Sequence, residues 1–234
     1  KEIIRDKEDL IEIMLEDEKL MRKVRQKEEE LLFISPYFLF NILLRQVRRQ
    51  LRERGYTFEF SGQERIAVFD ADRLNELLKS NELINCLAEV LSSFTRVQTG
   101  FLFYWQGEKL KRQKFNSLNP QDLIALGNLL PEEERFPVYR RLGDLCLFMA
   151  GIFPDYARRP GQSLRLTATR LSLEEYRELG SHYYSLAARH PAARREGLEG
   201  LLDSLASNFA LVIKPLNVLA SDYIGLRRNR WFGV

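Results

Sequence analysis

The amino-acid sequence predicts a mainly α-helical globular protein, a multi-helix bundle with one or two small β-hairpins. Three observations support this fold class. Helix-start signals recur along the chain, as a capping side chain, a proline in the first turn or a full capping box. Apolar residues between these signals repeat at three- and four-residue spacing, as on the buried face of a helix. Only two stretches, near residues 56–68 and 98–114, have the alternating or aromatic pattern of strands.

The composition is that of a folded soluble protein. With 234 residues, of which 45% are apolar and 29% charged, the chain can bury a sizeable core and does not resemble a disordered or fibrous sequence. No run approaches the roughly 20 apolar residues that span a bilayer. The first residues, Lys1 to Asp6, are too charged for a signal segment. We therefore expect a cytoplasmic location and no contact with a membrane.

Residues 1–32 predict an amphipathic helical arm. They hold eight Lys/Arg and eleven Asp/Glu, which leaves 28 against 22 in the remaining chain. Apolar side chains recur at helical spacing on one face, at Leu10, Met14, Met21, Val24 and Leu31. This stripe is thin and is interrupted at Asp17 and Glu28, so the arm packs either on the body or on a second chain. Residues 33–234 are expected to form a single helical domain.

The first helix of that domain begins at Ser35-Pro36, a capping hydroxyl followed by proline, and runs to Gly55. Its first half is apolar nearly all round, which predicts a place in the core. Its second half is rich in arginine. After Gly55 the apolar residues alternate through Tyr56 and Phe60 and resume at Ile66, which predicts the hairpin near 56–68.

The next helix is predicted to begin at Asp70, which acts as its cap, while Phe69 and Leu74 form a hydrophobic staple. Ser80-Asn81 is expected to divide this stretch into two helices. The aromatic run of residues 101–105, followed by Gly107 and a basic segment, favours the second hairpin near 98–114. Whether this segment is strand or helix stays open from the sequence.

The second half of the chain has the clearest helix starts. Asn119-Pro120 and Pro137 each begin a helix, and Ser172 with Glu175 forms a capping box. The last long helix carries apolar residues from Leu198 to Ile213, and Pro215 is expected to kink or break it. The tail from residue 226 to residue 232 is basic and aromatic.

The sequence holds no recognised catalytic signature, and we lean away from an enzyme. Only His182 and His190 are present. Cys86 and Cys146, both within apolar helical patterns, predict two buried free thiols in a reducing compartment. Such a set predicts no metal site and no cofactor.

Two carboxylate positions are candidates for chemistry. Glu178 lies one helical turn before His182, and Asp144 follows Arg140 and Arg141 in an otherwise apolar helix. For both pairs a structural role is favoured over catalysis, because neither comes with a nucleophile or a pocket signal.

Two arginine clusters give the better functional hypothesis. The first is spaced i, i+3, i+4, i+7 and consists of Arg45, Arg48, Arg49 and Arg52; the second, with an aromatic for stacking, consists of Arg227, Arg228, Arg230 and Trp231. A stripe of guanidinium groups can track the phosphates of a nucleic acid. The alternative is a solvated helix face paired with the acidic arm.

Residues 141–154 (RLGDLCLFMAGIFP) and 176–184 (YRELGSHYY) resemble segments of bacterial helical proteins of unassigned function. The resemblance implies a bacterial source and transfers no active site.

The sequence thus leaves three functional hypotheses. The first is a non-enzymatic helical module that acts through protein contacts, as a partner-binding protein or as a homodimer joined through residues 1–32. The second is nucleic-acid binding through the arginine clusters. The third is an enzyme or small-molecule sensor with a pocket between helices and hairpins.

Overall fold

The structure, a computed structural model, describes residue 15 and residues 17–61, 64–68, 70–95, 99–106, 109–155 and 171–233. It is mainly α-helical with two small hairpins, as the sequence predicts. The chain divides into two compact units, one of Lys1–Thr57 with Phe69–Thr95 and one of Phe58–Val68 with Arg96–Val234. This division differs from the expected arm over 1–32 and single domain over 33–234, because the helices up to residue 95 pack among themselves.

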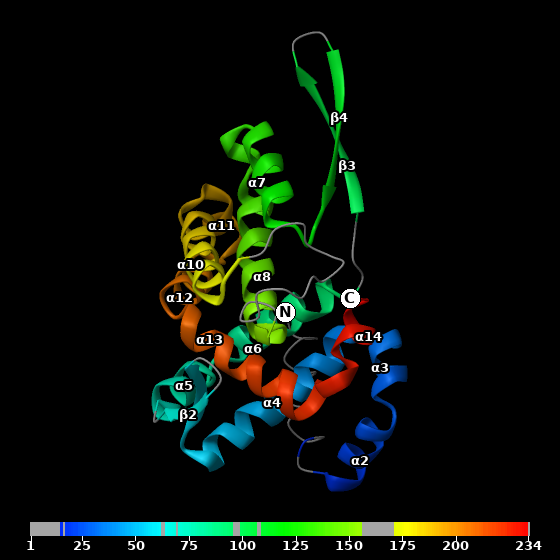
Figure 1. The fold of residues 1–234 in the computed structure, drawn as a ribbon, viewed down its shortest axis with the longest axis vertical. Coiled ribbons are helices and arrows are strands. Elements are labelled where there is room, and N and C mark those ends of the chain that lie inside the picture. Colours follow the sequence, from blue (N-terminus) through cyan, green and yellow to red (C-terminus); the bar gives the residue numbers. More distant parts are fainter. Residues whose placement is uncertain are drawn as a thin grey trace. The chain divides into compact units, whose positions relative to one another are not determined.

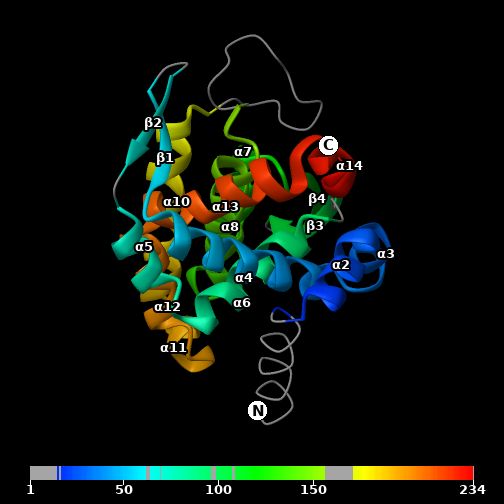
Figure 2. The same cartoon turned by 90° about the horizontal axis from the view of Figure 1, so that it is seen from below.

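The first unit is built around α4, Pro36–Arg54, which lies against α5, Ala71–Leu77, and α6, Asn81–Ser93 (Figure 2). The Ser35 hydroxyl accepts a hydrogen bond from the Phe38 N–H at 3.4 Å, and Gly55 ends the helix with a left-handed φ of +69°. Because the first half of α4 is apolar on almost every side, it is buried on almost every side, as expected.

The described part of the N-terminal arm forms two helices rather than one, α2, Glu18–Gln26, and α3, Glu28–Ile34. Residues 1–14 and 16 of the predicted arm lie outside the described residues. Met21 and Val24 are buried, and Gln46 of α4 donates a hydrogen bond to the Met21 sulfur at 3.7 Å. This part of the arm therefore packs on its own unit, which was one of the two alternatives.

The start of α5 differs from its predicted cap. The Asp70 side chain makes no capping hydrogen bond and instead accepts one from the Thr57 hydroxyl. Phe69 of the expected staple lies outside the described residues. The expected division at Ser80-Asn81 is confirmed, because the Ser80 hydroxyl caps α6 by accepting from the Leu83 N–H at 3.2 Å.

The second unit centres on α8, Phe136–Ile152. Three helices lie against α8, namely α7, Pro120–Leu129, α10, Leu173–Arg189, and α13, Phe209–Val218 (Figure 1). The short helices α11, Pro191–Glu196, and α12, Glu199–Ser207, follow α10 and pack on it. The short 3-10 turn η1, Glu132–Glu134, precedes α8.

Glycines set the spacing of this helical core. A Cβ at Gly143 would lie 2.6 Å from the Tyr184 ring, one at Gly151 would lie 2.6 Å from Leu216 Cβ, and one at Gly180 would lie 2.1 Å from the Phe209 ring. Only glycine fits at such distances, so α8 approaches α10 and α13 closely at these positions.

The predicted capping box at the start of α10 is confirmed. The Ser172 hydroxyl accepts from the Glu175 N–H at 3.1 Å, and the Glu175 carboxylate accepts from the Ser172 N–H at 2.6 Å. The hydrogen bond from the Ser172 backbone is the main cause of a lowered pKa at Glu175, and the Ser172 side chain adds to it. The predicted starts at Asn119-Pro120 and Pro137 are confirmed as well.

Of the two effects expected of Pro215, a kink or a break of the last helix, the break does not occur. Pro215 lies inside α13, and the chain breaks earlier, at Asn208, whose side chain donates to the Ser204 carbonyl at 3.0 Å. The Asn217 side chain donates to the carbonyls of Gly151 at 3.0 Å and of Ile213 at 3.0 Å. This bonding to α8, together with burial of Pro215, keeps α13 helical through the proline. The chain then widens into the π-helical turn η2, Leu219–Ile224.

Both predicted hairpins are confirmed, and both belong to the second unit apart from Thr57. The first consists of β1, Thr57–Ser61, and β2, Glu64–Val68; the second consists of β3, Thr99–Gln106, and the antiparallel β4, Lys109–Asn116. The turn residues 62–63 and 107–108 lie outside the described residues.

Candidate functional site

The arginines of α4 do not form an exposed stripe. Arg45 is 1% exposed and Arg48 is 8% exposed, whereas Arg49 and Arg52 lie at the surface. Arg49 pairs with Glu53 of the same helix, with Nε and Oε1 3.7 Å apart. The predicted nucleic-acid surface is therefore wrong for its first two members. Spacing along a helix gives the side on which residues lie, but it does not show that another helix covers that side.

The buried arginines belong to a polar network between α4 and α6. Arg45 donates from Nε to Asn41 Oδ1 at 2.8 Å and from Nη1 to Asn81 Oδ1 at 3.3 Å. Arg48 donates to the same Asn81 oxygen at 3.1 Å and to the Leu78 carbonyl at 3.4 Å. Asn41 in turn donates to Asn85 Oδ1 at 2.7 Å.

This network is structural, because each of these hydrogen bonds joins two groups inside the first unit. The sequence carried a signal for it that was missed. Asn41 and Arg45 are spaced i, i+4 on α4, as are Asn81 and Asn85 on α6, so each pair lies on one helix face.

The C-terminal cluster also turns inward. Its residues form the 3-10 turn η3, Gly225–Arg227, and the helix α14, Arg228–Phe232. Trp231 is 3% exposed, with the Arg227 guanidinium 4.9 Å from its ring centroid. Because the indole is buried, its predicted role as a stacking platform for bases is wrong. Arg230 lies at the surface.

Arg228 fastens this tail to the C-terminal end of α8. It donates to the Ile152 carbonyl at 3.4 Å and to the Asp155 carboxylate at 2.9 Å, and its guanidinium lies 5.5 Å from the centroid of the Phe153 ring. Phe232 inserts edge-on against Phe148 and Phe153, with ring centroids 4.9 and 6.2 Å apart. The predicted tail is thus part of the core of the second unit, and the two arginine clusters lie in different units.

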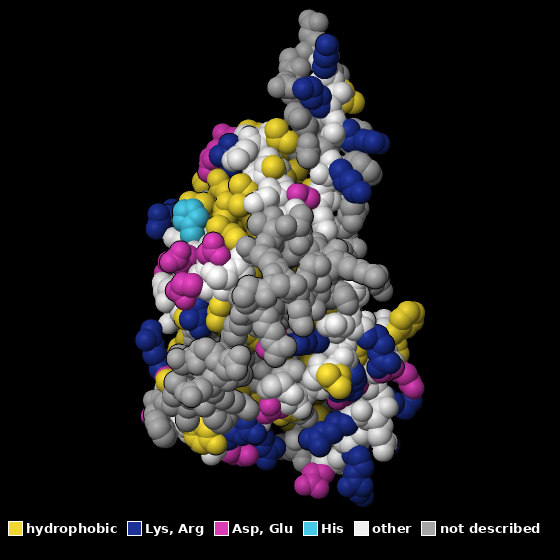
Figure 3. All heavy atoms as spheres, in the orientation of Figure 1, with side chains coloured by type: hydrophobic (Ala, Val, Ile, Leu, Met, Phe, Trp, Pro, Cys, Tyr) yellow, Lys and Arg dark blue, Asp and Glu magenta, His cyan; other side chains and the backbone are white. Residues whose placement is uncertain are grey.

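The exposed basic surface lies on the β3–β4 hairpin. β4 carries Lys109, Lys111, Arg112 and Lys114, all exposed, and contains no acidic residue. The hairpin extends beyond the helices of its unit, and Lys and Arg side chains lie along it (Figures 1 and 3). We call these four residues the basic strand. This basic segment is visible in the sequence, but no function was inferred from it there.

The base of the hairpin is anchored on α7. The Asn116 N–H donates to Asp122 Oδ2 at 2.9 Å, and the other oxygen of Asp122 accepts from the Asn119 side chain at 2.8 Å. Leu118, in the connection, is 2% exposed. These contacts fix the end of β4 to the helical body while the basic strand reaches solvent.

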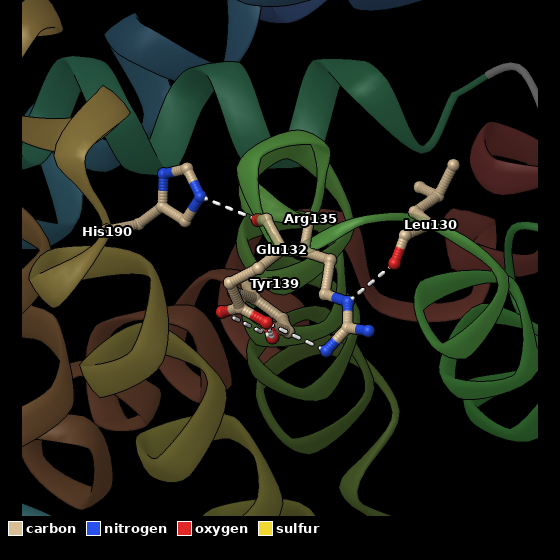
Figure 4. A network of polar contacts seen from close by, with 5 residues as sticks. All are labelled: Leu130, Glu132, Arg135, Tyr139 and His190. Atoms are coloured by element: carbon tan, nitrogen blue, oxygen red, sulfur yellow. Dashed lines mark hydrogen bonds and ion pairs between the residues drawn. The ribbon is translucent and has the colours of Figure 1, made fainter.

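A second polar network, drawn in Figure 4, joins the 130–135 segment to the start of α11. His190 Nδ1 accepts from the Ala192 N–H at 3.1 Å, so Nε2 carries the proton and donates to the Glu132 carbonyl at 2.9 Å. Arg135 donates to the Leu130 carbonyl at 2.9 Å and to the Glu132 carboxylate at 2.8 Å, which also accepts from the Tyr139 hydroxyl. His190 is thus a helix cap, a role that His-Pro before α11 can signal.

The remaining candidates for chemistry have structural partners. Asp144 is 8% exposed and accepts from the Tyr184 hydroxyl at 2.7 Å. Burial lowers the pKa of Arg141, although the charge of Asp144 nearby raises it. His182 and Glu178 are both exposed.

Both cysteines are buried free thiols, as predicted, and burial raises the pKa of the Cys146 thiol. Among the described residues, no group of three or more His, Cys, Asp or Glu side chains could hold a metal ion.

One helical stretch in the described part of the chain, Phe209–Phe232, is long and apolar enough to cross a membrane, with a mean hydropathy of 1.3 over its most apolar window. Half of that window is buried inside the protein. Because buried core helices of soluble proteins meet the same test, the length and hydropathy of this stretch are weak support for a membrane span.

The fold and this surface define a class, a mainly helical protein with a basic two-stranded ribbon and buried arginine networks. Comparisons with protein-family models, with curated proteins and with solved structures find no match. The resemblance of residues 141–154 and 176–184 to bacterial helical proteins stays a prediction.

Proposed function

We propose that this protein binds nucleic acid through the β3–β4 hairpin. The observation that carries the proposal is the basic strand, in which four of the six residues from 109 to 114 are exposed cations. The phosphate backbone is the dominant source of affinity in nucleic-acid complexes, and exposed Lys and Arg side chains supply it. A two-stranded ribbon that extends from a helical body also has a shape that can enter a groove or lie along a strand.

This proposal moves the predicted interface from the arginine clusters to the hairpin. Strand geometry explains the arrangement, because successive residues of a strand point to opposite faces. Lys109 and Lys111 lie on one face of β4, and Arg112 and Lys114 lie on the other. The phosphate backbone of a nucleic acid that wraps around the ribbon would therefore meet cations on both faces.

Replacing Lys109 and Lys111 together by alanine is expected to weaken nucleic-acid binding by about tenfold or more near physiological salt. The slope of log affinity against log salt is expected to fall by about 1.5, since each lost phosphate contact accounts for roughly 0.7 to 0.9. Fluorescence anisotropy with labelled single-stranded and duplex oligonucleotides over a salt series measures both quantities.

The matched control is Arg189→Ala with Arg195→Ala, which removes the same charge from exposed positions of the same unit. We expect this control to change affinity much less. Absence of salt-dependent binding by the native chain to every oligonucleotide, or equal losses in the two double variants, would overturn the proposal.

Self-association through the arm is a second candidate function, favoured by the surface of α3. Phe33 and Ile34, adjacent at its end, are 81% and 75% exposed. The same two helices expose charges of both signs, with Arg22 and Arg25 on α2 and Glu29 on α3. Two copies related by a two-fold axis can bury the apolar pair and match these opposite charges, so we propose a second copy of the chain as the occupant.

The double variant Phe33→Ser with Ile34→Ser is expected to convert a dimer to a monomer, as measured by light scattering across a concentration series. Leu226→Ser is the control, since Leu226 is a fully exposed leucine of the other unit. A native chain that stays monomeric at every concentration would remove this candidate.

A further inference from the structure

The register of the β3–β4 hairpin brings aromatic and basic positions to one face. The pairs are Phe101 with Lys114, Phe103 with Arg112 and Trp105 with Leu110. Residues paired across an antiparallel ladder share a face, and so does every second residue along each strand. These six positions therefore share one face of the ribbon.

The opposite face has a different composition. Its pairs are Gln106 with Lys109, Tyr104 with Lys111, Leu102 with Gln113 and Gly100 with Phe115. It has two cations and two aromatic positions, Tyr104 and Phe115. The first face therefore has the larger aromatic set, with three alternate positions of β3 beside two cations of β4.

This combination has a specific consequence for the nucleic acid that is bound. Aromatic side chains beside a basic groove bind unpaired bases by stacking, irrespective of sequence. In a duplex the base faces are already stacked on one another, so a duplex offers this face only phosphates. An unpaired strand offers both phosphates and base faces.

We propose that the ribbon binds single-stranded nucleic acid in preference to duplex, with bases stacked on positions 101, 103 and 105 and phosphates held by Arg112 and Lys114. The inference rests on the proposed nucleic-acid function and deepens it by naming the substrate class.

The test compares single-stranded and duplex oligonucleotides of the same length. Phe103→Val, which keeps a residue suited to strands, is expected to weaken single-strand binding about tenfold, the change that loss of one stacked base produces. It is expected to leave duplex binding within about twofold, since phosphate contacts alone hold the duplex. Leu102→Val, on the opposite face, is the control and is expected to leave both affinities unchanged.

A second readout does not depend on any loss of affinity. The chain has two tryptophans, and Trp231 is buried at 3% exposure. Stacking on Trp105 is expected to quench tryptophan fluorescence when single-stranded oligonucleotide is added, and duplex is expected to quench it much less. Trp105→Phe, which keeps an aromatic ring, should retain affinity but lose the quench.

The outcomes separate the two proposals. Equal binding of single strand and duplex, unaffected by Phe103→Val but weakened by Lys109→Ala with Lys111→Ala, overturns the single-strand inference and leaves the nucleic-acid function standing. A native chain whose fluorescence is unchanged by a saturating single strand also overturns the inference. Salt-independent association, or none at all, with every oligonucleotide overturns both.

Discussion

Replacing Gly180 by alanine is expected to lower the free energy of unfolding by about 3 kcal/mol, the upper part of the range for overpacking a core. A Cβ added at Gly180 would lie 2.1 and 2.4 Å from two atoms of the Phe209 ring and 2.8 Å from Cys146 Cβ. Both neighbours are buried, at 3% and 0% exposure. Neither has open space into which it can move, so α10 would have to shift away from α8 and α13.

The sign of this prediction opposes intrinsic helix propensity. Alanine in place of glycine normally stabilises a helix by roughly 0.5 to 1 kcal/mol. Gly200→Ala on α12 is the matched control, because a Cβ there meets nothing within 4 Å, and it should be neutral or stabilising. Urea unfolding followed by circular dichroism measures both variants. A Gly180→Ala chain as stable as the native one would show that the helices are not packed as described.

Arg45→Ala is expected to cost about 3 kcal/mol of unfolding free energy, because it removes a buried side chain and its charged hydrogen bonds at once. Arg45 is 1% exposed and links Asn41 of α4 to Asn81 of α6. Without Arg45, the buried Asn41 Oδ1 would lose the hydrogen bond that it now accepts from Arg45 Nε at 2.8 Å. The effect should appear as weakened protection of α4 and α6 amides in hydrogen exchange.

Arg52→Ala is the control for this position, since Arg52 belongs to the same predicted stripe but is exposed. Its effect on stability should stay within about 0.5 kcal/mol. The pair also separates a structural role from a binding role. If Arg45→Ala left stability unchanged and selectively weakened oligonucleotide binding, the buried network would be contradicted and the original arginine stripe would return as the interface.

Helix starts were predictable because a cap is a local device. Ser35, Asn119 and Ser172 accept hydrogen bonds from N–H groups two or three residues ahead, so the partners lie within one short window of sequence. The strands of the first hairpin were predictable for a similar reason, since alternation along a few residues and a short turn specify the pairing. The second hairpin was favoured by its aromatic run, but the sequence left residues 98–114 open between strand and helix. Asp70 shows the limit, because its carboxylate binds Thr57, thirteen residues away, instead of its own helix.

The candidate site was harder to predict than the fold. Helical spacing placed the four arginines of α4 on one side, but part of that side meets α6, where Asn81 receives hydrogen bonds from both Arg45 and Arg48. The basic strand went unassigned because a Lys-rich segment has the same appearance whether it covers a body or extends from it. Only the strand pairing shows that its cations sit on a two-stranded ribbon.

The amino-acid sequence by itself determined the helical class, the capped helix starts, the hairpin near 56–68 and the buried thiols. Each of these depends on hydrogen bonds or apolar periodicity within a few residues. Tertiary structure alone decided that Arg45, Arg48 and Trp231 turn inward, that α13 continues through Pro215, and that Gly180 lies under Phe209. These outcomes depend on residues tens of positions apart, because burial of a side chain is set by the element packed against it and not by its neighbours in sequence.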